Sequence, residues 1–337
     1  MKICLYFEAE KMLQTSGIGR ALQHQKRALE SAGIEYTLDP EDEYDLLHIN
    51  TVGVSSSSVI ANAKKRNKKV IYHAHSTEED FRDSFLLSNQ MAPFFKRHIV
   101  NLYAQADAII TPTPYAKSLL EAYGLTMPIH PVSNGIDLKH YAKDDQKIKA
   151  FRKYFGLSET QKVVISVGLY LKRKGIQDFM EVAKQFPDVK FIWFGYTPLI
   201  SIPASIRHMI EDHPSNVILP GYVKGPIIEG AYASANHFFF PTYEETEGIV
   251  VLEALASKCP VLVRDIGVFN PWLVDGVNCH KAFDNEGFSA ILRQSFEGTL
   301  SSTLEAAYQT ASERTLPNIG QQLKEIYVPL LNEGGST

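Results

Sequence analysis

Short apolar runs alternate with longer stretches of helical length along almost the whole of this 337-residue chain. Polar or turn-forming residues bound each run, as they bound the buried strands of a parallel sheet. The alternation predicts an α/β fold of stacked β–α units with mainly parallel sheets. The predicted strands are residues 3–7, 46–49, 70–73, 108–111 and 129–132, followed by 163–167, 190–194, 217–219, 237–240 and 261–263.

The chain is longer than one hydrophobic core usually organises, and its 45% hydrophobic content is enough for two cores. Between the two groups of strands, Ser133–Asp137 has turn chemistry, and the charged stretch 143–153 follows it. We therefore expect two Rossmann-like halves with a boundary near Asp137.

Composition excludes several classes of protein. A net charge of −4 argues against a dedicated nucleic-acid binder. The three cysteines, Cys4, Cys259 and Cys279, are too scattered for a disulfide framework or a zinc site, so we expect a reducing cytoplasm. No signal-peptide pattern opens the chain, and no segment reaches the roughly 20 apolar residues of a membrane-spanning helix.

Pro241–Ala254 places two carboxylates around a glycine that opens a predicted helix, just after the apolar run 237–240. Ligands of open α/β sheets collect at such strand-to-helix edges. Backbone N–H groups near Gly248 can face a diphosphate, Glu253 can accept hydrogen bonds from a ribose diol, and Glu245 can touch a sugar. The alternative is an acidic helix N-terminus, which the helix dipole favours without any ligand.

Two further loops follow predicted strands. Gly17 and Gly19 precede a helix, but Leu22 stands where a dinucleotide fingerprint requires a third glycine, so a dehydrogenase is a poor interpretation. The two glycines can equally shape a simple turn, with Arg20 as a candidate phosphate or acceptor contact. Lys172–Lys174 puts three cations before a helix, where they can neutralise a diphosphate leaving group or form an ordinary solvated loop.

Two histidines lie at the end of another predicted strand. His73 and His75 alternate, so one of them is expected to face a ligand at the sheet edge. A histidine at a strand end is more often a hydrogen-bonded structural residue. A metal site is not expected, because no cysteine or third histidine lies nearby in the sequence to complete a tetrahedral set.

The spacing of Glu245 and Glu253, with Gly248 between them, resembles the paired-glutamate motif of retaining GT-B glycosyltransferases of family 4. The resemblance extends over nearly the whole chain. It implies two Rossmann-like domains facing a central cleft and a UDP-hexose-dependent transferase that needs no cofactor or metal. It implies an acceptor and membrane domain over 1–137, a nucleotide-sugar domain over 138–316, and a C-terminal helix over 317–337 that packs back on the first domain.

The same resemblance assigns the site. It implies His75, Lys174 and Glu245 as catalytic residues, with His73 as the weaker alternative to His75. The family has an arginine where this chain has Leu169, and we predict Arg173 as its substitute. The donor-binding residues are predicted to be Gly17, Arg173, Tyr222, Val223, Thr246, Glu247, Gly248, Ile249, Val250 and Glu253.

Three segments resemble more narrowly the glycolipid synthases of Gram-positive bacteria, which add a second hexose to monoglucosyl diacylglycerol: Tyr6–Met12, Ser16–Arg20 and His73–Phe81. The resemblance is to the streptococcal type, and it implies that this chain transfers galactose from UDP-galactose to monoglucosyl diacylglycerol, with retention of α configuration, to form a diglycosyl diacylglycerol. We expect a front-face substitution in which the departing diphosphate helps to deprotonate the acceptor hydroxyl. The alternatives are a soluble family member acting on polysaccharide or protein acceptors, and a non-catalytic sugar-nucleotide or membrane-binding module on the same fold.

The acceptor of such an enzyme lies in a membrane, and two segments suit an anionic surface. One is the run of cations within 63–69. The other, 93–105, starts with the helix-compatible Pro93 and mixes aromatic and basic residues. The alternative for the second segment is a core helix that packs Phe95, Ile99 and Leu102 on the sheet. We predict peripheral binding at the cytoplasmic face through Lys64, Lys65, Arg66, Lys68, Lys69, Phe94, Phe95, Lys96 and Arg97.

Overall fold

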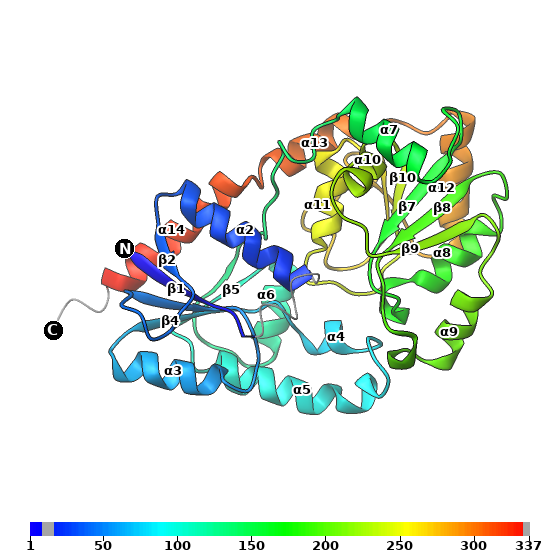
Figure 1. Ribbon diagram of the computed structural model, residues 1–337. Helices are drawn as coiled ribbons and strands as arrows, with labels where there is room; N and C mark the ends of the chain where they lie inside the picture. The colour runs from blue at the N-terminus through cyan, green and yellow to red at the C-terminus, as the bar shows by residue number, and fades with distance from the viewer. Residues whose placement is uncertain (9–16, 333–337) are drawn as a thin grey trace. The chain divides into compact units, whose positions relative to one another are not determined.

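The computed structural model describes residues 1–8 and 17–332, which fall into two compact units. Each unit is built on a sheet whose six described strands are all parallel (Figure 1). The α/β class and the two Rossmann-like sheets are therefore confirmed. Unit 1 comprises Met1–Phe81, Gln90–Ile136 and Arg314–Thr337, and unit 2 comprises Arg82–Asn89 and Asp137–Glu313.

The sheet of unit 1 has the strand order β2-β1-β3-β4-β5-β6. From β1 the chain adds β2 on one side and β3 to β6 on the other, so the strand order reverses between β1 and β3. The carboxyl ends of two such strands bound the crevice where open α/β sheets bind ligands. The strands are β1 (Lys2–Tyr6), β2 (Glu35–Thr37), β3 (Leu46–Ile49), β4 (Lys69–His73), β5 (Ala108–Thr111) and β6 (Ile129–Pro131).

Helices cover both faces of this sheet, and the strand residues alternate between them (Figure 1). In β4, Val70 and Tyr72 pack with α3, α5 and α6, whereas Ile71 packs with α2 and α14. The C-terminal helix α14 therefore belongs to the core of unit 1. The helices are α2 (Gly17–Ser31), α3 (Ser56–Lys65), α4 (Glu78–Phe81), α5 (Ser88–Tyr103), α6 (Pro114–Ala122) and α14 (Leu316–Asn332); residues 333–337 of the predicted C-terminal segment lie outside the described residues.

Helix α5 begins five residues before the proline that was expected to start it, so that prediction is wrong. Leu87 has a left-handed backbone, with φ of 66°, and the helix follows it directly from Ser88. The Ser84 N–H donates to the Ser88 hydroxyl at 3.2 Å, which fixes the turn before the helix. Pro93 lies inside the helix at an exposed position, where water can solvate the carbonyl that loses its N–H partner.

The sheet of unit 2 has the order β12-β11-β10-β7-β8-β9, so its reversal lies between β7 and β10. These two strands pair directly, with Phe238 opposite Ile165. The loops that leave their carboxyl ends are residues 168–175 and 241–248. The strands are β7 (Val163–Val167), β8 (Lys190–Phe194), β9 (Val217–Gly221), β10 (His237–Phe240), β11 (Val261–Arg264) and β12 (His280–Ala282).

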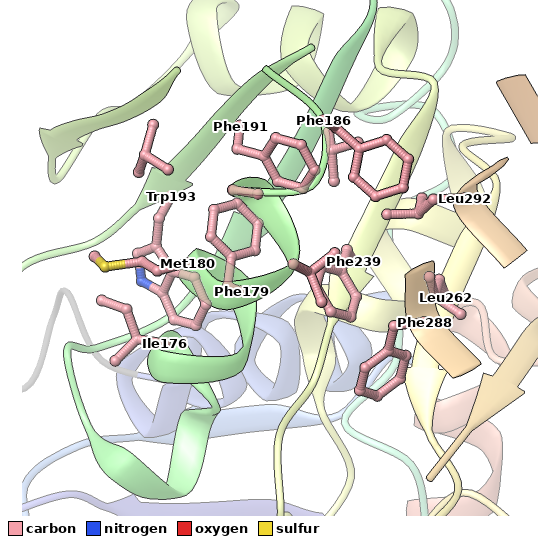
Figure 2. Packing of buried hydrophobic residues seen from close by; sticks show 14 of the residues in the cluster. Ile176, Phe179, Met180, Phe186, Phe191, Trp193, Phe239, Leu262, Phe288 and Leu292 are labelled. Carbon is pink, nitrogen blue, oxygen red and sulfur yellow. The ribbon is translucent and has the colours of Figure 1, made fainter. Parts of the chain in front are cut away.

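An aromatic core on one face of this sheet packs β7, β8 and β10 against α8, α9 and α12 (Figure 2). The Phe179 ring lies at its centre, with ring centroids 5.3 Å from Phe191, 5.2 Å from Trp193 and 5.8 Å from Phe239. Such packing makes a rigid base for the two loops at the reversal. The helices of unit 2 are α7 (Asp145–Tyr154), α8 (Ile176–Ala183), α9 (Ala204–Glu211), α10 (Pro226–Ser234), α11 (Ile249–Ala256), α12 (Asn285–Glu297) and α13 (Leu304–Ser312), with short 3-10 turns at η1 (Lys172–Lys174) and η2 (Leu199–Ser201).

Candidate active site

The two loops at the reversal of unit 2 lie against each other. Gly175 has a φ of 75°, and a Cβ atom on it would lie 2.2 Å from the carbonyl oxygen of Pro241. Only glycine allows both the left-handed turn and this close approach. The loop with the three predicted cations and the loop with the first predicted glutamate are thus held in contact.

Lys174 and Glu245 meet in this contact. The Nζ atom of Lys174 lies 2.5 Å from Oε1 of Glu245, and the hydroxyl of Thr242 donates to the same oxygen at 2.9 Å. Both side chains are mostly buried, with exposed fractions of 16% for Lys174 and 8% for Glu245. In such surroundings the pair is weakly screened by solvent. The structure therefore joins two of the predicted catalytic residues in one buried ion pair.

The second predicted glutamate lies on α11. Gly248, with a φ of 89°, precedes the helix in a left-handed conformation, and Glu253 is buried one turn further along. The hydroxyl of Tyr232, on α10, donates to Oε2 of Glu253 at 2.8 Å. Glu247 and Ile249 are also buried, whereas Thr246 and Val250 are half-buried. Tyr232 was not foreseen, and its contact shows how α10 orients the carboxylate of Glu253.

Arg173 is engaged within unit 2. Its Nε atom donates to the Ser84 hydroxyl at 3.1 Å, and its Nη1 atom donates to the carbonyl of Glu244 at 2.7 Å. Its backbone N–H donates to the carbonyl of Asp83 at 3.2 Å. The guanidinium thus holds residues 82–89 and the loop 241–248 in place, and the role of phosphate cation predicted for it stays a prediction.

Arg264, at the end of β11, is a residue of this site that sequence reasoning missed. It is buried, and it donates to the carbonyls of Pro241 and Phe283. Its Nη2 atom lies 3.3 Å from Oδ2 of Asp178, in the first turn of α8. One guanidinium therefore fixes the start of the 241–248 loop and the start of α8. A cation that ends an apolar strand at this sheet edge was the available sequence signal.

We expect Arg264→Lys to lower the free energy of unfolding of unit 2 by about 2 kcal/mol and kcat severalfold, because lysine keeps the charge but its single nitrogen replaces the three that reach Pro241, Phe283 and Asp178. Urea unfolding followed by tryptophan fluorescence measures the first effect, since both tryptophans lie in unit 2. Arg293→Lys is the matched control, because Arg293 is exposed on α12 and donates to Gln185. Equal losses in the two variants would contradict the role of Arg264.

Tyr222 and Val223 follow β9 in the same unit. Tyr222 is 43% exposed and has the ammonium of Lys224 at 5.3 Å from its ring centroid. Val223 is half-buried. Their predicted contact with the nucleotide stays a prediction.

In unit 1, His75 lies just beyond the carboxyl end of β4. Its Nε2 atom lies 2.9 Å from Oδ1 of Asn50, and its ring stacks on His73 with centroids 4.1 Å apart. Burial lowers the pKa of His75 to about 3, so the ring is neutral at ordinary pH. Gly17 opens α2 after β1; residues 9–16, including Ser16 and most of the Tyr6–Met12 segment, lie outside the described residues.

The predicted membrane-binding residues separate into exposed and engaged groups. Lys64 and Lys65 are exposed at the end of α3. Arg66 donates to the carbonyls of Pro40 and Asp42, and Lys69 lies 3.8 Å from Asp107. Lys68 is half-buried, with its ammonium 5.9 Å from the ring centroid of Tyr44. The run of cations is therefore not a uniformly exposed patch.

On α5, Phe94 is 73% exposed and Arg97 is exposed. Phe95, by contrast, packs on the core of unit 1 and stacks on Phe81 with ring centroids 4.2 Å apart. The period of the helix turns it to the same side as Ile99 and Leu102, in line with the core-helix alternative, and its role as a membrane contact stays a prediction. Lys96 pairs with Glu78 at 3.2 Å.

Within residues 1–8 and 17–332, no group of three or more histidine, cysteine, aspartate or glutamate side chains is arranged to hold a metal ion. Over the same part of the chain, no helix combines the length and the apolar character needed to cross a membrane.

Comparison with known proteins identifies the family. Residues 31–140 match the family model described as Glycosyltransferase Family 4, and residues 147–309 match the model described as Glycosyl transferases group 1. A processive diacylglycerol alpha-glucosyltransferase of Acholeplasma laidlawii is 47% identical over 97% of this chain and 98% of its own length. The chain belongs to the group 1/family 4 glycosyltransferases. An alpha-galactosylglucosyldiacylglycerol synthase of Streptococcus pneumoniae is 25% identical over 80% of the chain and 74% of its own length.

Solved structures agree on the fold of this glycosyltransferase. HepE from Anabaena, solved in complex with UDP and glucose, has a TM-score of 0.79 at 18% identity and covers 97% of this chain and 99% of its own. Sucrose-phosphate synthase from Thermosynechococcus elongatus has a TM-score of 0.81 at 16% identity and covers 99% and 100%. The likeness confirms the predicted GT-B class of fold.

Proposed function

We propose that this glycosyltransferase transfers a glucosyl group from UDP-glucose to a diacylglycerol-based lipid. The observation that carries the proposal is the 47% identity, over nearly the full length of both chains, to a protein named processive diacylglycerol alpha-glucosyltransferase. The position of the Lys174–Glu245 pair at the reversal of the sheet of unit 2 supports a sugar-nucleotide site there. The similarity to a named glucosyltransferase and the position of the ion pair thus both support a sugar-nucleotide-dependent transferase.

In the proposed reaction, the bond between the anomeric carbon and the diphosphate oxygen breaks, and its electron pair leaves with UDP. Lys174 stabilises the negative charge that develops on the diphosphate, together with the backbone N–H groups at the start of α11. Glu253 accepts from the ribose hydroxyls, and His75 contacts the donor sugar. The residues proposed to act on the donor are those predicted from the sequence. Tyr232 holds Glu253 in place, and Arg264 holds Pro241 at the start of the loop that carries Glu245.

We propose retention of the α configuration by front-face substitution. The acceptor oxygen attacks the anomeric carbon from the side of the departing diphosphate, and the hydroxyl proton passes to a diphosphate oxygen. Double displacement would need a carboxylate nucleophile at the anomeric carbon. Glu245 is poorly suited to that task, because Oε1 already accepts from Lys174 and Thr242.

The test is product analysis after incubation of the purified protein with UDP-glucose or UDP-galactose and anionic vesicles that contain diacylglycerol or monoglucosyl diacylglycerol. We expect an α-linked glucosyl lipid from UDP-glucose. Hydrolysis of a UDP-sugar without a lipid product would overturn the lipid acceptor and favour the polysaccharide or protein acceptors of the alternative interpretation. The absence of both transfer and hydrolysis would favour a binding module.

A second candidate is transfer of galactose to monoglucosyl diacylglycerol, as the sequence resemblance implies. Its support is the streptococcal relative named alpha-galactosylglucosyldiacylglycerol synthase, which is 25% identical. The assay above separates the two candidates, because a galactosyl product formed only from UDP-galactose and monoglucosyl lipid would favour the second.

The proposed acceptor requires contact with a membrane, and we propose that Lys64 and Lys65 provide its electrostatic part. Near an anionic surface each lysine contributes about 1 kcal/mol, so Lys64→Gln with Lys65→Gln should weaken vesicle binding by about tenfold or more. Flotation of the protein with phosphatidylglycerol vesicles at low salt measures this. The matched control is Lys149→Gln with Lys153→Gln, two exposed lysines on α7 of unit 2. Wild-type protein that stays unbound, or a control that loses as much binding, would contradict the proposal.

A further inference from the structure

Three buried histidines stack in a row on the face of the unit 1 sheet that α2 and α14 cover. The rings of His48 and His73 lie 5.3 Å apart at 9°, and those of His73 and His75 lie 4.1 Å apart at 5°. We call these three residues the histidine column. At one end of the column, His48 contacts Tyr327 of α14, and the other end is His75, the predicted active-site histidine.

The contact with Gln25 determines which ring nitrogens of His73 and His48 donate and which accept. Nε2 of Gln25 lies 2.7 Å from Nδ1 of His73, and an amide nitrogen can only donate, so this Nδ1 is an acceptor. Nε2 of His48 lies 3.2 Å from the same atom, and a hydrogen bond that shares this acceptor places the proton of His48 on Nε2. Nδ1 of His48 is then an acceptor for the hydroxyl of Tyr327, at 2.6 Å.

In the same way, Asn50 determines which ring nitrogen of His75 carries the proton. Its Oδ1 atom can only accept, so the Nε2 atom of His75 carries the proton of the neutral imidazole. Nδ1 of His75 is left as an acceptor. The plane of the ring is fixed by its stacking on His73, whose own position Gln25 holds.

The column is polar at a cost that packing alone does not explain. Within the described part of the chain, Nδ2 of Asn50, Oε1 of Gln25 and Nε2 of His73 are buried without a hydrogen-bond partner. Each such atom is destabilising, and apolar side chains could fill the same space. Ile71, two residues before His73 on the same face of β4, is an example.

We propose that Asn50, with Gln25 acting through His73, is a positioning residue that holds His75 in its Nε2–H tautomer and presents Nδ1 to a hydroxyl of the donor sugar. The tautomer follows from the contacts above. The sugar hydroxyl as the partner of Nδ1 rests on the proposed function.

The tautomer is tested without any assay of activity. In protein labelled with ¹⁵N-histidine, long-range ¹H–¹⁵N spectra distinguish Nε2–H from Nδ1–H rings, and a His75→Gln variant assigns the signal of His75. We expect His75 as the Nε2–H tautomer in the wild type and a mixture of tautomers in Asn50→Ala. A wild-type His75 with the proton on Nδ1, or an unchanged signal in Asn50→Ala, would overturn the assignment. Gln25→Ala, which should perturb the His73 signal first, serves if Asn50→Ala does not fold.

The positioning role is tested by the rate of UDP-sugar hydrolysis or transfer. We expect Asn50→Ala to lower kcat between about ten- and a hundredfold, with a smaller change in KM, as a misplaced catalytic group does. Asn50→Asp keeps an acceptor oxygen and should recover the tautomer and much of kcat. Ser295→Ala is the matched control, since Ser295 is the 2.6 Å partner of the buried His237 in unit 2; it should alter only the His237 signal. Normal kcat with a changed tautomer would refute the positioning role, whereas no turnover in the wild type would refute the proposed function and leave the tautomer assignment standing.

Discussion

Lys174→Ala is expected to lower kcat/KM by at least about tenfold, which corresponds to about 1.4 kcal/mol of transition-state stabilisation. The ammonium of Lys174 is one of the few charges at the reversal of the unit 2 sheet that is buried enough to act strongly on a leaving diphosphate. Steady-state rates with saturating lipid acceptor and varied UDP-sugar measure the effect. Lys172→Ala is the matched control, because Lys172 belongs to the same 3-10 turn but is 59% exposed.

A loss of activity in Lys174→Ala could also follow from a loss of stability, because the variant breaks a buried ion pair. A double variant separates the two effects. Lys174→Ala leaves Glu245 beside Thr242 and with Nη1 of Arg173 at 3.9 Å, so the loss of its cation is expected to lower the free energy of unfolding by about 3 kcal/mol. Glu245→Ala on the same chain removes the uncompensated charge. The double variant should therefore recover stability in urea.

Activity is expected to behave differently from stability. If Lys174 acts on the diphosphate, the double variant stays at least about tenfold slower than the single variant Glu245→Ala, even where the two are equally stable. A double variant that is both stable and fully active would mean that the pair only holds the two loops together. Near-normal rates in Lys174→Ala alone would remove the residue from the catalytic group.

The sequence predicted the sheets well because apolar runs report burial on both faces of a parallel strand. β7, β8 and β10 were predicted with the bounds that the structure has. β2 and β12 were missed, since each has three residues and lies at the edge of its sheet, where half-exposed residues such as Tyr36 and Lys281 interrupt the apolar pattern.

The sequence placed Lys174 and Glu245 in two loops but could not show that they pair. That pairing depends on β7 and β10 being neighbours, which is a property of strand order and not of either loop. Asn50, Gln25 and Arg264 were missed for the same reason. Each acts through a partner far away in the sequence, such as His75 for Asn50 and Asp178 for Arg264.

Local pattern was the only guide to the predicted membrane-facing residues, and it could not separate exposed side chains from engaged ones. A run of cations looks uniform in the sequence, yet Arg66 donates to three acceptors of its own unit. Phe94 and Phe95 are adjacent and similar, and the helix turns one outward and the other into the core. Only the packing of α5 on its sheet distinguishes them.

Acidification is expected to unfold unit 1 before unit 2. Burial lowers the pKa of His48 and His75 to about 3, and it lowers the pKa of His73 well below the ordinary 6.5. The unfolded chain therefore takes up these protons first as the pH falls. The stability that depends on neutral rings is complete above pH 6.5 and is lost as the pH falls from 6.5 toward the folded-state values.

Each such histidine costs up to about 1.4 kcal/mol per pH unit below 6.5, so the column should cost unit 1 several kcal/mol between pH 7.5 and 5. That is a large part of the roughly 5–15 kcal/mol that stabilises a typical domain. In unit 2, burial lowers the pKa of one histidine, His237, to about 3, and the expected loss is correspondingly smaller.

Urea unfolding at several pH values, followed in parallel by two signals, measures the difference. Tryptophan fluorescence reports unit 2, where Trp193 and Trp272 lie, and far-ultraviolet circular dichroism reports both units. We expect the dichroism midpoint to fall earlier on acidification than the fluorescence midpoint. His48→Gln should reduce the pH dependence of unit 1 by about one proton, because one of the three histidines of the column is removed. The exposed His208→Gln should leave it unchanged, and an equal effect of the two variants would mean that the column does not govern the acid stability of this unit.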